Sequence, residues 1–95
     1  MLITIRLFAR LREIARASEL RRTLPDDATA RTAWDLLVGE FPQLGDYATA
    51  VSCAVNEEYA RMTTTLKEGD EIAFLPPVSG GESTRDAGSG MRDRE

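Results

Sequence analysis

The sequence predicts an α+β domain in which a mixed sheet packs on one main amphipathic helix. Three patterns lead to this class. Residues 2–8 alternate as a strand does, residues 30–41 carry an apolar stripe at helical spacing, and short strand-like runs follow the stripe up to residue 75. Because strands precede and follow a single long helix, we expect that helix to cover one face of a sheet.

Composition narrows the class of protein. The chain has 95 residues, which predicts one domain with one modest core. Its net charge of −4 argues against general nucleic-acid binding, and no apolar run approaches the roughly 20 residues of a membrane helix. One Cys and no His exclude a His/Cys zinc site and a His-dependent active site. We therefore expect a cytoplasmic protein with no bound metal, no nucleic acid and no membrane among its partners.

The N-terminal segment predicts a strand, a short helix and a second strand. In residues 2–8 one face of the strand carries Ile3, Ile5 and Leu7. Helical spacing then places Leu11, Ile14, Ala15 and Ser18 on one side of a short helix. Residues 19–24 follow as a second strand, with Leu20 and Leu24 in phase.

The main helix has the clearest signal. Its apolar stripe consists of Ala30, Ala33, Trp34, Leu37, Val38 and Phe41. Thr29 is suited to cap its N-terminus, and Pro42 stops it. Since Trp34 lies within the stripe, we expect its ring to fill the core.

The remaining strands are short. Residues 51–55 suit a buried strand, 56–58 a turn, and 59–62 another strand. Cys53 is expected to be a small buried thiol. Residues 67–70 form a turn with Gly69 at the position where a positive φ is needed. Residues 71–75 form the last strand, with Ile72 and Phe74 facing the core.

The segment after the last strand carries the chemistry. Residues 76–81 read Pro-Pro-Val-Ser-Gly-Gly. The two prolines project the chain away from the sheet, and the two glycines can enter a channel that any Cβ would block. If the chain ended at Gly81, its carboxylate could attack the α-phosphate of ATP, and a sulfur nucleophile could then displace AMP to leave a thiocarboxylate.

These motifs resemble the ubiquitin-like sulfur carriers, in particular the small subunits of molybdopterin synthase (MoaD-like). The resemblance covers residues 1–81 as one domain and rests on LFARLREI at 7–14, CAVN at 53–56, LKEGDEIAF at 66–74 and LPPVSGG at 75–81. It implies a β-grasp fold with a mixed sheet. It also implies a protein cosubstrate, with no permanently bound cofactor and no enzyme activity of its own.

The resemblance further implies partners and site residues. Gly81 would be activated with ATP by a ubiquitin-activating-type adenylyltransferase and converted to a thiocarboxylate. Gly80 and Gly81 would then enter the large subunit of molybdopterin synthase, where the sulfur passes to a cyclic pyranopterin monophosphate. The partner-binding residues would be Phe8, Leu75, Pro76, Pro77, Val78 and Ser79. Other acceptors in thiamine, thiolated tRNA or cysteine synthesis stay open, as does a β-grasp interaction module that carries no sulfur.

Strand phasing supports a docking face independently. If Ile5 and Phe74 face the core, then Phe8, Ala73 and Leu75 face away from it. Adjacent exposed apolar residues beside a reactive tail indicate a partner surface. The alternative is that Phe8 turns inward where the first helix begins.

The chain departs from the family pattern after Gly81, because residues 82–95 follow it. This polar extension is expected to be disordered, since it cannot bury enough surface to offset the entropy of ordering. It consumes the Gly81 carboxylate in a peptide bond. The extension is a cleavable segment removed by a processing protease, a linker derived from a fused arrangement, or a sign of lost carrier function, and we favour cleavage.

Charge is unevenly distributed along the chain. Residues 1–22 contain six Arg, for which a solvated surface is a better interpretation than a nucleic-acid patch. Acidic residues 57, 58, 68, 70 and 71 are expected to cluster near the end of the sheet from which the tail leaves, where they could steer a basic activating enzyme.

Overall fold

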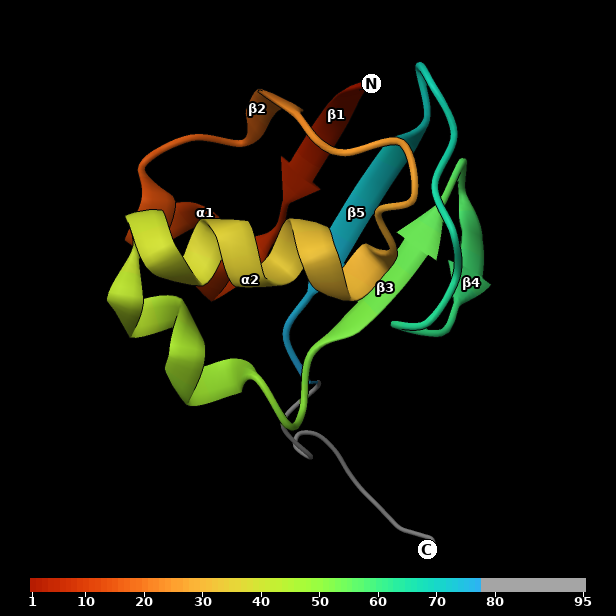
Figure 1. The fold of residues 1–95 in the computed structure, drawn as a ribbon. Helices are drawn as coiled ribbons and strands as arrows, with labels where there is room; N and C mark the ends of the chain where they lie inside the picture. The colour runs from red at the N-terminus through yellow and green to blue at the C-terminus, as the bar shows by residue number, and fades with distance from the viewer. Residues whose placement is uncertain (78–95) are drawn as a thin grey trace, which may run out of the picture.

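Five strands and two helices form the described part of the protein, which is residues 1–77 in a computed structural model (Figure 1). The elements are β1 (Leu2–Leu7), α1 (Ala9–Ala15), β2 (Glu19–Thr23), α2 (Ala30–Glu40), the 3-10 helix η1 (Pro42–Tyr47), β3 (Ser52–Val55), β4 (Glu58–Ala60) and β5 (Glu71–Leu75). The predicted α+β class and the order of strands and helices are confirmed.

The sheet is mixed, with the strand order β2-β1-β5-β3-β4. The two central strands, β1 and β5, run parallel, and Ile5 lies opposite Ile72. The other neighbours are antiparallel. The first and last strands of the described chain therefore lie side by side in the centre, and the chain leaves β5 at the lower end of the sheet in Figure 1.

The core lies between the sheet and α2, which crosses one face of the sheet (Figure 1). Alternation along the central strands buries Ile3, Ile5, Leu7, Ile72 and Phe74, as predicted. From α2, Ala30, Ala33, Trp34 and Leu37 complete the core. Its N-terminus has the predicted cap and a reciprocal pair of bonds, because Thr29 Oγ1 accepts from Thr32 N while Thr32 Oγ1 accepts from Thr29 N.

Several element boundaries differ from the sequence predictions. Helix α1 ends at Ala15, because Arg16 takes a left-handed conformation with φ +58, so Ser18 lies outside the helix and is exposed. Strand β2 ends at Thr23, and the buried Leu24 instead exchanges main-chain bonds with Met1. Only residues 56–57 form the turn after β3, so β4 begins at Glu58 and ends at Ala60, short of the predicted residue 62.

The 3-10 helix η1 was not predicted. Pro42 ends α2 as expected, but it also opens η1, where its missing N–H is harmless at the first turn. This short helix turns Leu44 into the core.

Within residues 1–77, no helix is long and apolar enough to cross a membrane. The predicted disorder of residues 82–95 lies outside the described range.

Candidate functional site

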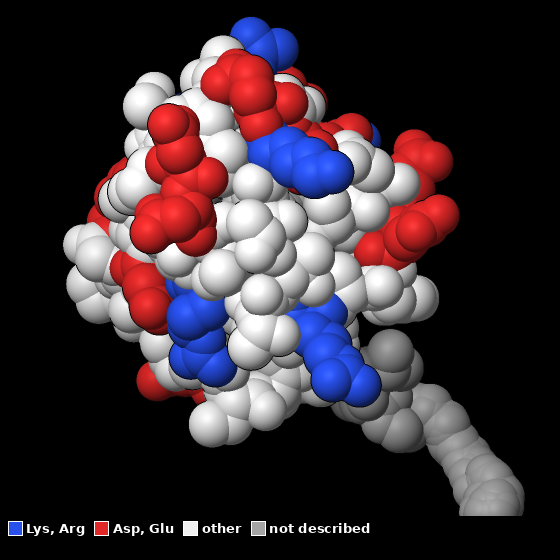
Figure 2. Space-filling view, turned by 45° about the vertical axis from the view of Figure 1, so that its right-hand side comes forward, with Lys and Arg blue, Asp and Glu red and all other residues white. Residues whose placement is uncertain are grey.

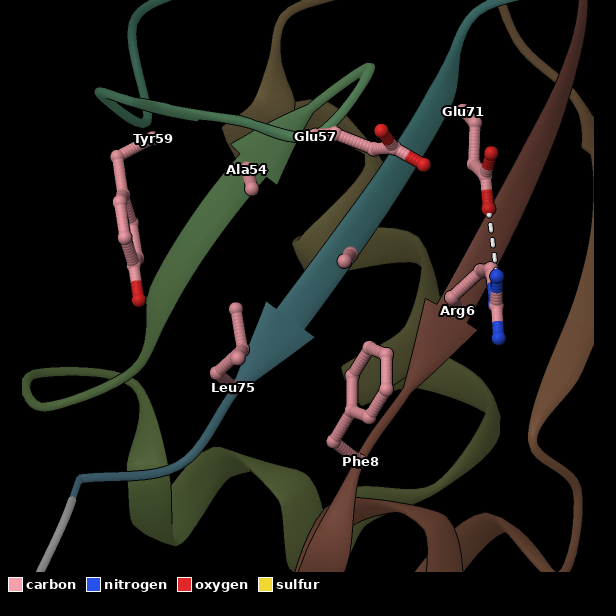
Figure 3. Close-up of a pocket in the computed structure, with 8 residues that line it drawn as sticks. Arg6, Phe8, Ala54, Glu57, Tyr59, Glu71 and Leu75 are labelled. Carbon is pink, nitrogen blue, oxygen red and sulfur yellow. Dashed lines mark hydrogen bonds and ion pairs between the residues drawn. The ribbon is translucent and has the colours of Figure 1, made fainter.

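A shallow hollow of about 280 Å³ lies on the face of the sheet opposite α2. Figure 3 shows this face, with the helices behind the strands. The lining side chains come from β1, β3, β4, β5 and the turns beside them, and they are Arg6, Phe8, Ala54, Glu57, Tyr59, Glu71, Ala73 and Leu75. The hollow lies on the face where strand phasing predicted Phe8, Ala73 and Leu75.

Small residues at the centre and large residues around them create the hollow. Ala54 of β3 lies directly opposite Ala73 of β5, so two methyl groups form its floor. Around this floor stand Phe8, Leu75 and Tyr59, whose side chains rise from three different segments (Figure 3). The alternation that buries Ile72 and Phe74 necessarily turns Ala73 and Leu75 to this open face.

Phe8 stays on the open face and does not turn inward. It is the N-cap of α1, its backbone is extended (φ −125°, ψ 154°), and 37% of the residue is exposed. The next residue, Ala9, has φ +51°, a left-handed conformation at the point where β1 gives way to α1. The alternative in which Phe8 packs into the core is therefore wrong, and its role in docking stays a prediction.

Arg6 is held between two other lining residues. Its Nη1 donates to Glu71 Oε2 at 3.1 Å, and its guanidinium carbon lies 5.6 Å from the centroid of the Phe8 ring. The ion pair and the cation–π contact together orient Arg6 along the edge of the hollow. Both charged side chains of the pair are partly exposed, so the interaction positions them more than it stabilises the fold.

The predicted tail residues begin at the rim of the hollow. Leu75 ends β5 and is half-buried, Pro76 follows half-buried, and Pro77 is exposed. The remaining predicted tail residues, Val78, Ser79, Gly80 and Gly81, lie outside the described residues. The structure thus brings Phe8 and Leu75 to one hollow and places the start of the predicted tail at its edge.

Tyr59 is a lining residue that sequence reasoning did not assign to the site. It pairs across the strands with Ala54, and 82% of it is exposed, the largest exposure among the large hydrophobic residues of the described chain. Strand alternation through residues 58–60 could have placed it outward. Its nearness to Phe8 and Leu75, however, depends on the sheet order, which puts β3 beside β5.

The acidic cluster lies at the opposite end of β5 from the predicted position. Glu71 opens β5, whereas the tail leaves after Leu75 at its far end. The turn before β4 joins the cluster there, because Asn56 Nδ2 donates to Asp70 Oδ1 at 3.0 Å. The residues do lie together, but away from the tail, since β3 and β5 are antiparallel.

Charges of both signs are dispersed over the surface. On the face shown in Figure 2, acidic and basic side chains lie among uncharged residues. Four of the six arginines in residues 1–22 form ion pairs with carboxylates, and these are Arg6, Arg10, Arg21 and Arg22. This pairing agrees with the interpretation of a solvated surface.

Cys53 is a buried thiol, as predicted. Its Sγ donates to the Ala60 carbonyl oxygen at 3.3 Å, and the residue is 2% exposed. Burial raises the pKa of the Cys53 thiol, because the thiolate would lose its hydration. The side chain belongs to the core and does not reach the hollow.

Comparison with known proteins assigns the chain to a family. A model described as the ThiS family matches residues 5–81, which is most of the chain. The chain belongs to the ThiS family. The matched region contains every residue that lines the hollow, and it ends at the second glycine of the predicted tail.

Relatives of this ThiS-family chain carry informative names. A molybdopterin synthase sulfur carrier subunit from Arabidopsis thaliana is 38% identical over 79 residues, covering 83% of this chain and 82% of that protein. Small archaeal modifier protein 1 from Haloferax volcanii is 37% identical over 84 residues, covering 80% of this chain and 97% of that protein. The resemblance to sulfur carriers of the molybdopterin synthase type is thereby confirmed.

Solved structures confirm the ubiquitin-like β-grasp fold. The crystal structure of the Haloferax volcanii protein SAMP1 superposes with a TM-score of 0.73 at 33% identity, covering 85% of this chain and all of that one. A molybdopterin converting factor subunit 1 from Pyrococcus furiosus, described as putative in its own name, superposes with a TM-score of 0.73 at 27% identity, covering 82% and 99%.

Proposed function

We propose that this chain is a sulfur carrier for molybdenum cofactor biosynthesis and the small subunit of a molybdopterin synthase. The observation that carries the proposal is the Gly80-Gly81 pair at the end of the ThiS-family match. Strand β5 ends six residues before Gly81, at the apolar end of the hollow. Relatives that share most of their length with this chain are named as sulfur carrier subunits of that synthase.

The proposed chemistry takes place at the carboxylate of Gly81. On a ubiquitin-activating-type adenylyltransferase, a carboxylate oxygen attacks the α-phosphate of ATP, and pyrophosphate leaves. A sulfur nucleophile then attacks the acyl carbon, AMP leaves, and Gly81 ends in a thiocarboxylate. The sulfur passes to a cyclic pyranopterin monophosphate held by the large subunit. This chain is a cosubstrate in these steps and needs no cofactor of its own.

Docking is assigned to the open face of the sheet. Phe8 and Leu75 would pack against the large subunit, and Pro76, Pro77, Val78 and Ser79 would lead the two glycines into its active site. Apolar side chains that are exposed together in the free protein favour such a role. The absence of a side chain on Gly80 and Gly81 suits passage through a narrow channel.

Residues 82–95 must be removed before Gly81 can react. A peptide bond joins Gly81 to Glu82, so no carboxylate is present at Gly81 in the full chain. We assign this removal to a processing protease. The polar composition of residues 82–95 favours access by such an enzyme.

The test is the intact mass of the protein isolated from its own host while the cofactor pathway is active. A species that ends at Gly81 with one oxygen replaced by sulfur is the expected result. Gly81→Ala should abolish the sulfur-containing species, whereas Gly88→Ala, which changes a glycine beyond the cleavage point, should leave it unchanged. A population in which every molecule still contains Glu82 would contradict the carrier function.

A second candidate function has one observation in its favour. The Haloferax volcanii relative is named a modifier protein, so the activated Gly81 carboxyl could instead be transferred to another protein. In the same host, denaturing gels would then show this chain in covalent adducts of higher mass that disappear with Gly81→Ala. Copurification of free thiocarboxylate with a molybdopterin synthase large subunit would favour the first candidate.

A further inference from the structure

The hollow on the open sheet face has two chemically different ends. Figure 3 shows Phe8 and Leu75 where β5 finishes, and Glu57 and Glu71 where β5 begins. At the charged end, Glu71 is already paired with Arg6 at 3.1 Å. Glu57 forms no ion pair within residues 1–77, so the lining carries one uncompensated negative charge.

The Glu57 side chain is directed over the hollow. It extends from the turn between β3 and β4 across β5 toward Glu71, as the close-up in Figure 3 shows. Two carboxylates thus face the same space with a single guanidinium between them and the apolar end. A second positive charge entering the hollow would meet a favourable electrostatic field there.

Glu57 occupies a position where its side chain does not help the fold. Asn56 and Glu57 form the two-residue connection between β3 and β4, and both have positive φ, +51° and +73°. Such a turn favours Asn followed by Gly. Asn56 suits it and is also anchored, because its Oδ1 accepts from Glu71 N at 3.1 Å and its Nδ2 donates to Asp70. Glu57 forms no hydrogen bond or ion pair within the described chain that would account for a Glu in place of Gly.

We infer that Glu57 recognises a basic side chain, Arg or Lys, of the protein that docks on this hollow, while an apolar side chain of the same partner packs against Phe8 and Leu75. This inference rests on the docking assigned to the sheet face in the proposed function. It adds an electrostatic contact to the apolar contacts of that docking, and it predicts that the partner presents one basic and one apolar side chain to the hollow. Electrostatic complementarity of this kind selects the correct partner and orients it more than it adds affinity.

Charge disfavours a second copy of this chain as the occupant. In a symmetric pair of copies joined through this face, two hollows that each carry a net negative charge would be brought together. The chain as a whole is also acidic, with a net charge of −4. A partner with a basic segment fits both facts.

The experiment measures the affinity of the full chain for the purified molybdopterin synthase large subunit of the same organism, at low and at high salt. Glu57→Gln should weaken binding about threefold at low salt, and Glu57→Lys about tenfold or more. The matched control is Glu58→Gln, because Glu58 is the adjacent exposed carboxylate but lines a second, separate hollow, together with Lys67 and Asp70. It should change the affinity less than about twofold. Salt should weaken the wild type more than the Glu57→Gln variant.

Glu57→Gly separates recognition from damage to the fold. Because Gly suits the positive φ, this variant should raise the melting temperature while it lowers the affinity. Affinities of Glu57→Gln and Glu57→Lys equal to wild type at low salt would overturn the inference. If Phe8→Ala weakens binding and the Glu57 variants do not, only the inference fails. If the wild-type chain does not bind, or if Phe8→Ala has no effect, the docking assigned in the proposed function fails with it.

Discussion

The indole ring of Trp34 meets the phenyl ring of Phe74 edge to face, with ring centroids 5.0 Å apart and planes inclined by 60°. This contact joins α2 to β5, the central strand that leads to the tail. Both residues are fully buried. The indole Nε1–H is buried and has no hydrogen-bond acceptor within the described residues, so the ring contributes packing without polar compensation.

We expect Trp34→Phe to change the free energy of unfolding by less than about 1 kcal/mol. The smaller ring leaves a cavity, which destabilises, but the variant also removes a buried unpaired donor, whose burial costs about 1–3 kcal/mol. Trp34→Ala has no such offset and should cost about 3–5 kcal/mol. Urea unfolding followed by far-ultraviolet circular dichroism checks both. A Trp34→Phe loss as large as that of Trp34→Ala would contradict the unpaired state of the indole.

Alanine substitutions at two glycines, each with open space for a Cβ, should change the stability of the fold in opposite directions. No atom lies within 4 Å of a Cβ built at Gly39 or at Gly69, but only Gly69 has a positive φ, +83°. Gly39→Ala in α2 should stabilise by about 0.5 kcal/mol. Gly69→Ala should destabilise by about 1 kcal/mol, because a left-handed backbone disfavours any Cβ. Melting temperatures of the two variants, which serve as each other's control, give the test, and shifts of the same sign would contradict it.

The ion pair between Arg22 and Glu40 predicts a pH dependence of stability. Arg22 donates two hydrogen bonds to this carboxylate, at 2.8 and 2.7 Å, which lowers the pKa of Glu40. The folded pKa then lies below the unfolded value of about 4.3. The stabilisation is therefore present above pH 4.3 or so and is lost as the pH falls through the folded pKa. At pH 7 it amounts to at most about 1 kcal/mol, since both side chains are about a third exposed.

The measurement compares wild type with Glu40→Gln by chemical denaturation from pH 7 down to pH 3. The difference in unfolding free energy should be constant near neutral pH and shrink in acid. Glu13→Gln, which removes the more exposed partner of Arg10, should give a smaller difference throughout. A Glu40→Gln difference that grows in acid would show that the sign is wrong.

Cys53 should be unreactive in the folded protein. Burial raises the pKa of its thiol, so the thiolate fraction at neutral pH is below that of a free cysteine. An aromatic disulfide reagent should modify native protein more slowly than protein in concentrated urea, by a factor on the order of ten or more. Equal rates in the two conditions would mean that β4, whose Ala60 accepts from the thiol, does not cover it.

Several parts of the fold could be predicted because they depend on local periodicity. Alternation along residues 2–8 correctly placed Phe8 on the face of the sheet opposite to the face that carries Ile5. Helical spacing correctly placed Trp34 in the core. The incorrect or missing predictions concern the ends of helices and strands and the way in which distant segments pack together. The end of α1 depends on the left-handed Arg16, and η1 depends on the space that the sheet and α2 leave for Leu44. Neither has a periodic signal.

The chemical character of the tail and the outward orientation of Phe8 and Leu75 follow from residue order alone, because strand period and the absence of a side chain on glycine are local properties. The hollow itself follows from the pairing of distant strands. Only when β5 lies between β1 and β3 do Phe8, Leu75, Tyr59 and Glu57 line one space. The same pairing places the acidic cluster away from the tail. Because β3 runs antiparallel to β5, the turn after β3 lies beside the start of β5, whereas the tail leaves from the end of β5.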